Sequence, residues 1–162
     1  MDATREAFKA IDRAMTGDSR VLEVGCGAGE MAERINALPG VSLVATDQSE
    51  DSVNLTAARG VDAREADICY LPFDGDSFDV VYAGWMLDHV RDIDRALAEV
   101  RRVLRPGGTF VAVTGADDSP GERRRHRFSS ETGERMLSRR FSDVRRQDLE
   151  TASGDVTVFE AR

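Results

Sequence analysis

The stretch VLEVGCGAGEMAERI, from Val21 to Ile35, decides the fold of this chain. It begins as an apolar, strand-like run, places three glycines within five residues, and continues with apolar residues at helical spacing. A strand that passes through a glycine-rich turn into a helix is typical of α/β proteins. Such a turn can cradle the phosphates of NAD, or it can hold something quite different. The neighbouring residues distinguish between these two kinds of ligand.

The length and composition predict a single domain over residues 1–162, with a hydrophobic content of 41%. No apolar run approaches the length of a membrane span, and the N-terminal residues have no signal-peptide pattern. Cys26 and Cys69 are too few for a disulfide framework or a metal-ligand set. We therefore expect a cytoplasmic protein with no membrane segment and no metal site.

The net charge of −8 is unevenly spread. Residues 121–146 carry nine arginines and four acids, so the remainder of the chain is strongly acidic. An acidic body makes nucleic acid an unlikely partner. The basic cluster consists of Arg123, Arg124, Arg125, His126 and Arg127, which form either a solvated surface or a contact for an acidic substrate or partner.

Strand and helix patterns alternate along the chain. Strands are predicted at 20–24, 41–46, 62–66, 78–83 and 109–114, and helices at 2–15, 29–37, 50–59 and 92–104. A helix at 130–140 and two strands at 142–149 and 156–161 follow. We expect a doubly wound, mostly parallel sheet with helices on both faces and an antiparallel hairpin at its end. The domain divides into an N-terminal helix (1–19), a core (20–114), a short insertion (115–128) and a C-terminal helix with the hairpin (129–162).

The glycine turn does not fit the dinucleotide fingerprint, whose third position is a small residue. Counted from Gly25 and Gly27, that position is Glu30, and Glu23 adds a second acid before the turn. An NAD-dependent oxidoreductase is therefore disfavoured. A G-x-G-x-G turn ending at Gly29 and preceded by an acid suits a ligand that has a cationic part and no phosphate, such as S-adenosylmethionine (SAM). A purely structural turn is the alternative.

Two more acids follow predicted strands. Asp47 ends the second strand, where a carboxylate can accept hydrogen bonds from ribose hydroxyls. The alternative is a helix-start signal, with Ser49 as the other candidate for the cap. Asp67 follows the third strand and could accept from the adenine amino group, with Ile68 offering the ring an apolar face. The alternative for Asp67 is an ordinary loop acid.

At this point the sequence resembles the class I SAM-dependent methyltransferases, and specifically the methyltransferase type 11 domain. The resemblance covers roughly residues 20–114 and rests on four blocks in the family's order: VLEVGCGAGEMAERI, ATDQSEDSV, ADICYLPFDGDSFDVVYAGWMLDHV and ALAEVRRVLRPGGTFVAVT. It implies a Rossmann-like sheet of seven strands in the order 3-2-1-4-5-7-6, with the last strand antiparallel. The cofactor it implies is SAM.

The resemblance also implies roles for individual residues. The methionine part of SAM would lie on the turn formed by Glu23, Gly25, Cys26, Gly27 and Gly29, the ribose at Asp47 and Gln48, and the adenine at Asp67 and Ile68. Ala83 would line the wall near the sulfonium and the incoming substrate. Cys26 is expected to be a small residue of the turn and not a nucleophile.

Methyl transfer mainly requires alignment of the reacting groups, and a base is needed only when the acceptor must lose a proton. His89 is the candidate base, although the family often carries a histidine here for structural or cofactor-side reasons. Asp88 beside it is either a second base or, more simply, a solvated acid at a helix start. Trp85 could stack on a substrate or on the adenine, or pack beneath a helix.

We therefore predict a methyltransferase acting on an O, N or C atom of a small organic acceptor. The alternative is a SAM-binding protein that is non-catalytic or depends on a partner. Relatives often have a longer N-terminal extension and a larger insertion after the fifth strand, so the acceptor site is expected to be open here. A large acceptor, a lid from another subunit and a degenerate enzyme are the competing explanations.

Overall fold

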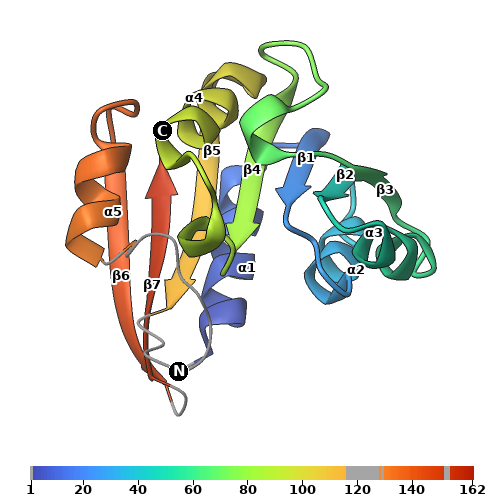
Figure 1. Ribbon diagram of the computed structural model, residues 1–162, viewed down its shortest axis with the longest axis horizontal. Helices are drawn as coiled ribbons and strands as arrows, with labels where there is room; N and C mark the ends of the chain where they lie inside the picture. The colour runs from blue at the N-terminus through green and yellow to red at the C-terminus, as the bar shows by residue number, and fades with distance from the viewer. Residues whose placement is uncertain (1, 116–127, 129, 152–153) are drawn as a thin grey trace.

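The structure is a computed structural model that describes residues 2–115, 128, 130–151 and 154–162. It forms a twisted sheet with helices on both faces (Figure 1). The strands are β1 (Ser19–Val24), β2 (Val41–Asp47), β3 (Asp62–Glu65), β4 (Phe78–Gly84), β5 (Leu104–Gly115), β6 (Val144–Thr151) and β7 (Gly154–Ala161). The helices are α1 (Ala3–Ala14), α2 (Glu30–Asn36), α3 (Glu50–Ala57), α4 (Ile93–Val103) and α5 (Ser130–Leu137), with two 3₁₀ turns, η1 (Ile68–Tyr70) and η2 (Leu87–His89).

The seven strands lie in the order β3-β2-β1-β4-β5-β7-β6, as predicted. Strands β1 to β5 pair in parallel, whereas β7 runs antiparallel to both β5 and β6. The chain first builds outward from β1 to β3 and then returns to β4 on the other side of β1. The carboxyl ends of β1 and β4 therefore meet where the strand order reverses, which is the usual ligand position in open α/β sheets.

Two apolar cores cover the faces of the sheet. On one face, β-strand side chains such as Leu22 and Val81 pack against α4 and α5. On the other face, Val21 and Val80 pack against α1 and α2. The alternation of neighbouring residues between the two cores follows from the two-residue period of a strand. Helix α3 lies beside α2, over β2 and β3 (Figure 1).

The observed boundaries differ from the predicted ones by a few residues at most elements, and by more at β5. This strand begins at Leu104, which pairs with Phe78, and includes the RPGG run that lies before the predicted strand at 109–114. The pairing shifts register before Val80 meets Thr109, so Arg105 to Gly108 pass through an irregular stretch of strand. Most of the predicted insertion, and with it the basic cluster from Arg123 to Arg127 including His126, lies outside the described residues.

Within the described part of the chain, no helix has the length and apolar character needed to cross a bilayer.

Candidate functional site

A cavity of about 620 Å³ opens at the carboxyl ends of the parallel strands. It lies where the strand order reverses, beside the ends of β1, β2 and β4 and the loop after β3. It is lined by Val24, Gly25, Thr46, Asp47, Gln48, Ala66, Asp67, Ile68, Cys69, Tyr70, Gly84, Trp85, Met86, His89, Val90, Arg91, Asp92 and Arg95. Aspartates, a histidine, apolar side chains and backbone of the glycine turn therefore converge on one space, the composition expected of a small-molecule site.

A smaller hollow of about 200 Å³ lies against the other side of the glycine turn. It is lined by Thr4, Glu23, Gly25, Cys26, Ala28, Gly29, Glu30, Met31, Tyr82, Gly84 and Trp85. Gly25, Gly84 and Trp85 line both spaces, so the two meet at the ends of β1 and β4. An elongated ligand could occupy both, with its middle at these three residues.

The three glycines of the turn all have a left-handed backbone, with φ of 74° at Gly25, 53° at Gly27 and 80° at Gly29. A Cβ atom on Gly25 would lie 2.9 Å from Cγ of Met86, and one on Gly29 would lie 2.7 Å from Oγ1 of Thr56. Only Gly27 faces open space. The glycines were expected to let a ligand approach the backbone closely. At two of the three, the close neighbours are side chains of the protein itself.

Glu23 is buried at the end of β1, with 3% of its surface exposed. Among the described residues, its Oε2 atom has no hydrogen-bond partner. Burial, reinforced by the negative charge of Asp47, raises the pKa of Glu23 to about 8. A cationic group entering the smaller hollow would give this carboxyl a partner and favour its ionised form.

Asp47 is held by two backbone N–H groups. Its Oδ2 accepts from Gly27 at 3.0 Å, and its Oδ1 accepts from Ser49 at 2.9 Å. Ser49, and not Asp47, is the N-cap of α3, because its hydroxyl accepts from the N–H of Ser52. Asp47 thus links the end of β2 to the glycine turn while lining the cavity, and Gln48 lines the cavity next to it.

Asp67 and Ile68, the two residues predicted to hold the adenine, both line the cavity. The Asp67 carboxylate accepts from the N–H of Cys69 at 2.8 Å and so caps the η1 turn. Asp67 therefore has a defined local role as the cap of η1, and it is not the ordinary loop acid that was considered from the sequence. Ile68 is 5% exposed, and it adds an apolar side chain to the wall.

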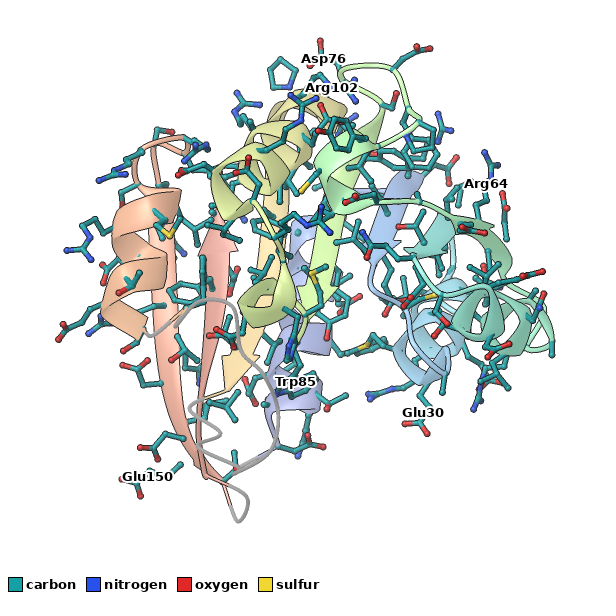
Figure 2. The ribbon with its side chains drawn as sticks, in the orientation of Figure 1. Glu30, Arg64, Asp76, Trp85, Arg102 and Glu150 are labelled. Carbon is teal, nitrogen blue, oxygen red and sulfur yellow. The ribbon has the colours of Figure 1, made fainter. Side chains whose placement is uncertain are left out.

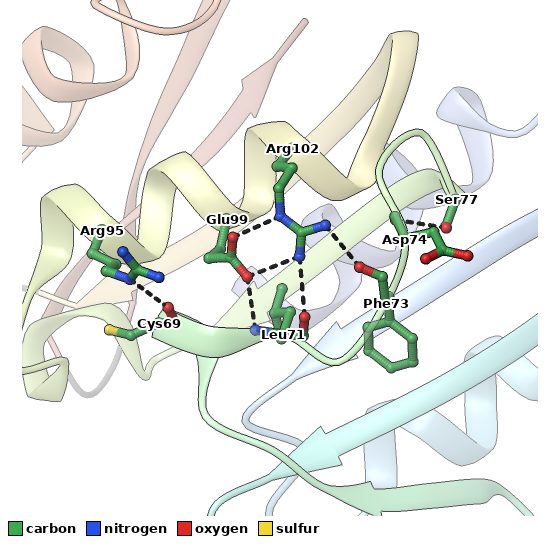
Figure 3. A network of polar contacts seen from close by, with 8 residues as sticks. All are labelled: Cys69, Leu71, Phe73, Asp74, Ser77, Arg95, Glu99 and Arg102. Atoms are coloured by element: carbon green, nitrogen blue, oxygen red, sulfur yellow. Dashed lines mark hydrogen bonds and ion pairs between the residues drawn. The ribbon is translucent and has the colours of Figure 1, made fainter.

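Side chains of α4 clamp the loop that carries Asp67 (Figure 3). Arg95 donates to the carbonyl of Cys69 at 2.9 Å, and Glu99 accepts from the N–H of Leu71 at 2.8 Å. Arg102 donates to the carbonyls of Leu71 and Phe73 and pairs with Glu99 at 2.7 Å. The hydrogen bond from Arg102 is the main reason why the pKa of Glu99 is lowered. The network fixes one wall of the cavity.

The turn after β4 carries the second wall. Trp85 is 43% exposed and has a left-handed backbone, with φ of 53°, although it is not glycine. Within the described part of the chain, Trp85 belongs to neither apolar core, unlike the packing beneath a helix that was considered for it. Met86 covers Gly25, and His89 lines the cavity from η2. Ala83 was predicted to line the cavity wall, but it is fully buried, and the next residue, Gly84, lines the wall instead.

The structure also tests one prediction for each turn, at Asp88 after β4 and at Cys26 after β1. Asp88 is 6% exposed and accepts from the N–H of Phe128 at 2.7 Å, so it is not a solvated acid. It was misread because a buried partner 40 residues away leaves no local signal in the sequence. Cys26 is 7% exposed, and its Sγ accepts from the Thr56 hydroxyl. It is the small, enclosed residue of the turn that was expected.

Several lining residues were not singled out from the sequence. Gly84, Met86 and Tyr70 line the cavity, and Thr4 brings the start of α1 to the smaller hollow. A glycine at the end of a buried strand was a usable signal for Gly84. Nothing local marked Thr4, because α1 reaches the hollow only through its packing on β4, β5 and β7.

Comparison with known proteins agrees with this geometry. The family described as a methyltransferase domain matches residues 22–112. The chain belongs to this family. Its class I members depend on SAM, and the matched residues include the glycine turn, Asp47, Asp67 and the turn after β4. All the residues that line the two spaces, except Thr4, therefore lie within the matched segment.

Two curated relatives and one solved structure illustrate the range of similar proteins. The sterol 24-C-methyltransferase of Schizosaccharomyces pombe is 32% identical over 67% of this chain and 31% of its own length. The ubiquinone biosynthesis O-methyltransferase of Agrobacterium fabrum is 32% identical over 59% of this chain and 40% of its own length. The chain thus spans less than half of these relatives. The [4+2]-cyclase SpnF superposes with a TM-score of 0.82 and 20% identity, covering 99% of this chain and 80% of that one, which shows a shared fold.

The residues present fit the cofactor that the family implies. The larger cavity offers carboxylates at Asp47 and Asp67 for hydroxyl and amino groups and an apolar wall at Ile68. The smaller hollow offers the unpartnered carboxyl of Glu23 for an ammonium group. A ligand with adenosine at one end, an amino acid at the other and a cationic centre between them matches this donor set.

Proposed function

We propose that this domain is a SAM-dependent methyltransferase that holds SAM across the two spaces. The adenosine lies in the larger cavity, with Asp47 and Gln48 at the ribose and Asp67 with Ile68 at the adenine. The methionine part lies in the smaller hollow beside Glu23. The observation that carries the proposal is the meeting of the two spaces at Gly25, Gly84 and Trp85, next to the unpartnered carboxyl of Glu23.

When bound, SAM supplies a methyl group on a positively charged sulfur, which is a good leaving group. The chain then has to hold the acceptor in line with that methyl group and keep water away. The clamped loop after β3 would hold the adenosine end of SAM, and Gly25, packed by Met86, and Gly84 would hold its middle at the junction of the two spaces.

We infer that the acceptor is a small organic molecule methylated at O, N or C. The sterol and ubiquinone methyltransferases among the relatives support this class. For a hydroxyl acceptor, His89 is the proposed base, because it lines the cavity beside the turn that carries Trp85. We also propose a cytoplasmic location, since both cysteines are buried free thiols, which suits a reducing compartment.

Calorimetric titration of the purified chain with SAM, S-adenosylhomocysteine and NAD tests the cofactor assignment. We expect the first two to bind and NAD not to bind, because Glu30 stands where a dinucleotide site needs a small residue. Binding of NAD alone, or of none of the three, would contradict the proposal.

Replacing His89 with alanine tests the role of the base. We expect SAM affinity to stay nearly unchanged while turnover with a phenol or catechol acceptor falls by about 10²–10⁴-fold, the usual contribution of a positioned base. Unchanged turnover would leave alignment alone as the source of catalysis.

A second candidate function is SAM binding without methyl transfer, or transfer that needs a partner subunit. The similarity of the fold to a [4+2]-cyclase supports this second candidate, because in that protein the same architecture accompanies a different reaction. SAM binding without turnover across a panel of phenol, amine and carbon acceptors would favour this candidate, and activity restored by an added protein would identify the partner-dependent case.

A further inference from the structure

Trp85 stands at the junction of the two spaces. It is one of the three residues that line both, and the only one of the three with a side chain. Its backbone N–H donates to the carbonyl of Val113 at 2.7 Å, which ties its position to β5. Figure 2 shows Trp85 below the end of β4, with Glu30 farther to the right at α2.

The indole of Trp85 is an uncovered aromatic surface. It is 43% exposed, and among the described residues no guanidinium or aromatic ring lies over it. Tyr70, the other exposed aromatic residue of the cavity wall, differs in this respect. The guanidinium of Arg95 lies 4.3 Å from its ring centre. Trp85 therefore has a free face for a ligand, whereas the face of Tyr70 is already occupied by a cation of the protein.

The charges around the smaller hollow favour a cation. Two carboxyl groups line it, those of the buried Glu23 and of Glu30, and among the described residues that line it there is no arginine, lysine or histidine. The electron-rich face of tryptophan attracts cations more strongly than that of any other side chain. An exposed indole beside two acids is the arrangement expected for recognition of an organic cation.

We propose that Trp85 recognises the positive charge of the sulfonium and so makes the domain prefer SAM to S-adenosylhomocysteine. The inference rests on the proposed function. If adenosine occupies the larger cavity and the amino acid occupies the smaller hollow, the sulfur that joins them lies at the junction, beside the indole. The two ligands share both ends and differ at that sulfur, which is cationic in SAM and neutral in the homocysteine product.

The preference has a consequence for turnover. Methyl transfer forms a bond from the acceptor to the methyl carbon, and the electron pair of the broken carbon–sulfur bond stays on sulfur. The charge that Trp85 attracts is then gone, so the product loses an interaction that the substrate had. Trp85 would thereby limit product inhibition without contacting the acceptor.

The test is the ratio of the SAM and S-adenosylhomocysteine dissociation constants, measured by calorimetry for the unsubstituted protein and for Trp85→Ala and Trp85→Phe. We expect Trp85→Ala to weaken SAM binding about fivefold or more and to change homocysteine binding less than about twofold. Trp85→Phe keeps a weaker aromatic face, so its ratio of dissociation constants should lie between those of the unsubstituted protein and Trp85→Ala. Tyr70→Ala is the matched control, because it removes an exposed aromatic of the same cavity without changing the ratio.

Unchanged product binding also shows that the variant is folded. Should Trp85→Ala not fold, the fluorescence of Trp85, the only tryptophan of the chain, gives a second measurement in the unsubstituted protein. We expect SAM to change it more than the product does at saturation. An equal loss of affinity for both ligands in Trp85→Ala, or equal fluorescence changes, would overturn the role in charge recognition. Failure of both ligands to bind the unsubstituted protein would instead overturn the proposed function.

Discussion

The turn after β1 and the turn after β4 touch one another and are built in opposite ways. The first reaches left-handed backbone angles only at glycines, where these angles cost little. The second reaches one at Trp85, where the same geometry costs about 1–2 kcal/mol. A strained conformation kept at a bulky, exposed side chain supports the recognition role proposed for Trp85. In this comparison the first turn provides shape, and the second provides the proposed recognition group.

The largest expected effect concerns the shape of the first turn. Gly29→Ala should lower the free energy of unfolding by about 2–4 kcal/mol, since the new methyl group would meet Thr56 at 2.7 Å in a left-handed backbone. Gly27→Ala is the control, with the same handedness and open space around it, and should cost only about 1 kcal/mol. Urea denaturation of both variants measures the difference. Equal losses would mean that the contact with Thr56 adds nothing.

Glu23, which precedes the first turn, should make stability depend on pH. Its pKa rises from 4.5 to about 8 on folding, so ionisation favours the unfolded chain and stability falls as the pH rises through this window. Glu23→Gln removes the effect. The variant should have the same free energy of unfolding as the unsubstituted protein at pH 4, and a free energy of unfolding about 2–4 kcal/mol higher above pH 8. The same substitution should weaken SAM binding, because the carboxylate for the ammonium is lost. A pH-independent difference would exclude the titration of Glu23 as its cause.

Asp47 connects the first turn to the cofactor. Asp47→Ala should weaken SAM binding by about 1–3 kcal/mol, because the ribose hydroxyls and the Gly27 N–H both lose their acceptor. Asp47→Asn is the matched control, since an amide oxygen can still accept one of these hydrogen bonds, and should lose less. Calorimetry with SAM measures both. Unchanged affinity in the alanine variant would remove the ribose assignment.

The smallest effect concerns the strain in the second turn. Trp85→Ala and Trp85→Gly both remove the indole, but only glycine relaxes the left-handed backbone. The glycine variant should therefore be more stable than the alanine variant by about 1 kcal/mol, as measured by thermal denaturation. Equal stability would show that the turn carries no strain at Trp85, and the contrast between the two turns would lose its energetic basis.

The sequence alone determined the class of fold and, through the family resemblance, the strand order, and it marked most of the residues proposed to hold the cofactor. These follow from short-range patterns: apolar runs, a glycine turn and acids directly after strands, such as Asp47 and Asp67. Each such signal lies within a few residues of its element, so it can be recognised without knowing which other segments pack nearby.

Only the tertiary structure decided which neighbours those residues meet. It placed Met86 over Gly25 and Thr56 over Gly29, buried Asp88 against Phe128, and put Gly84 in the place expected for Ala83. It also left the face of Trp85 uncovered while Arg95 covered that of Tyr70. Each of these depends on contacts between segments distant in sequence. Such contacts are fixed by how the helices and turns pack around the sheet, and local residue patterns carry no record of them.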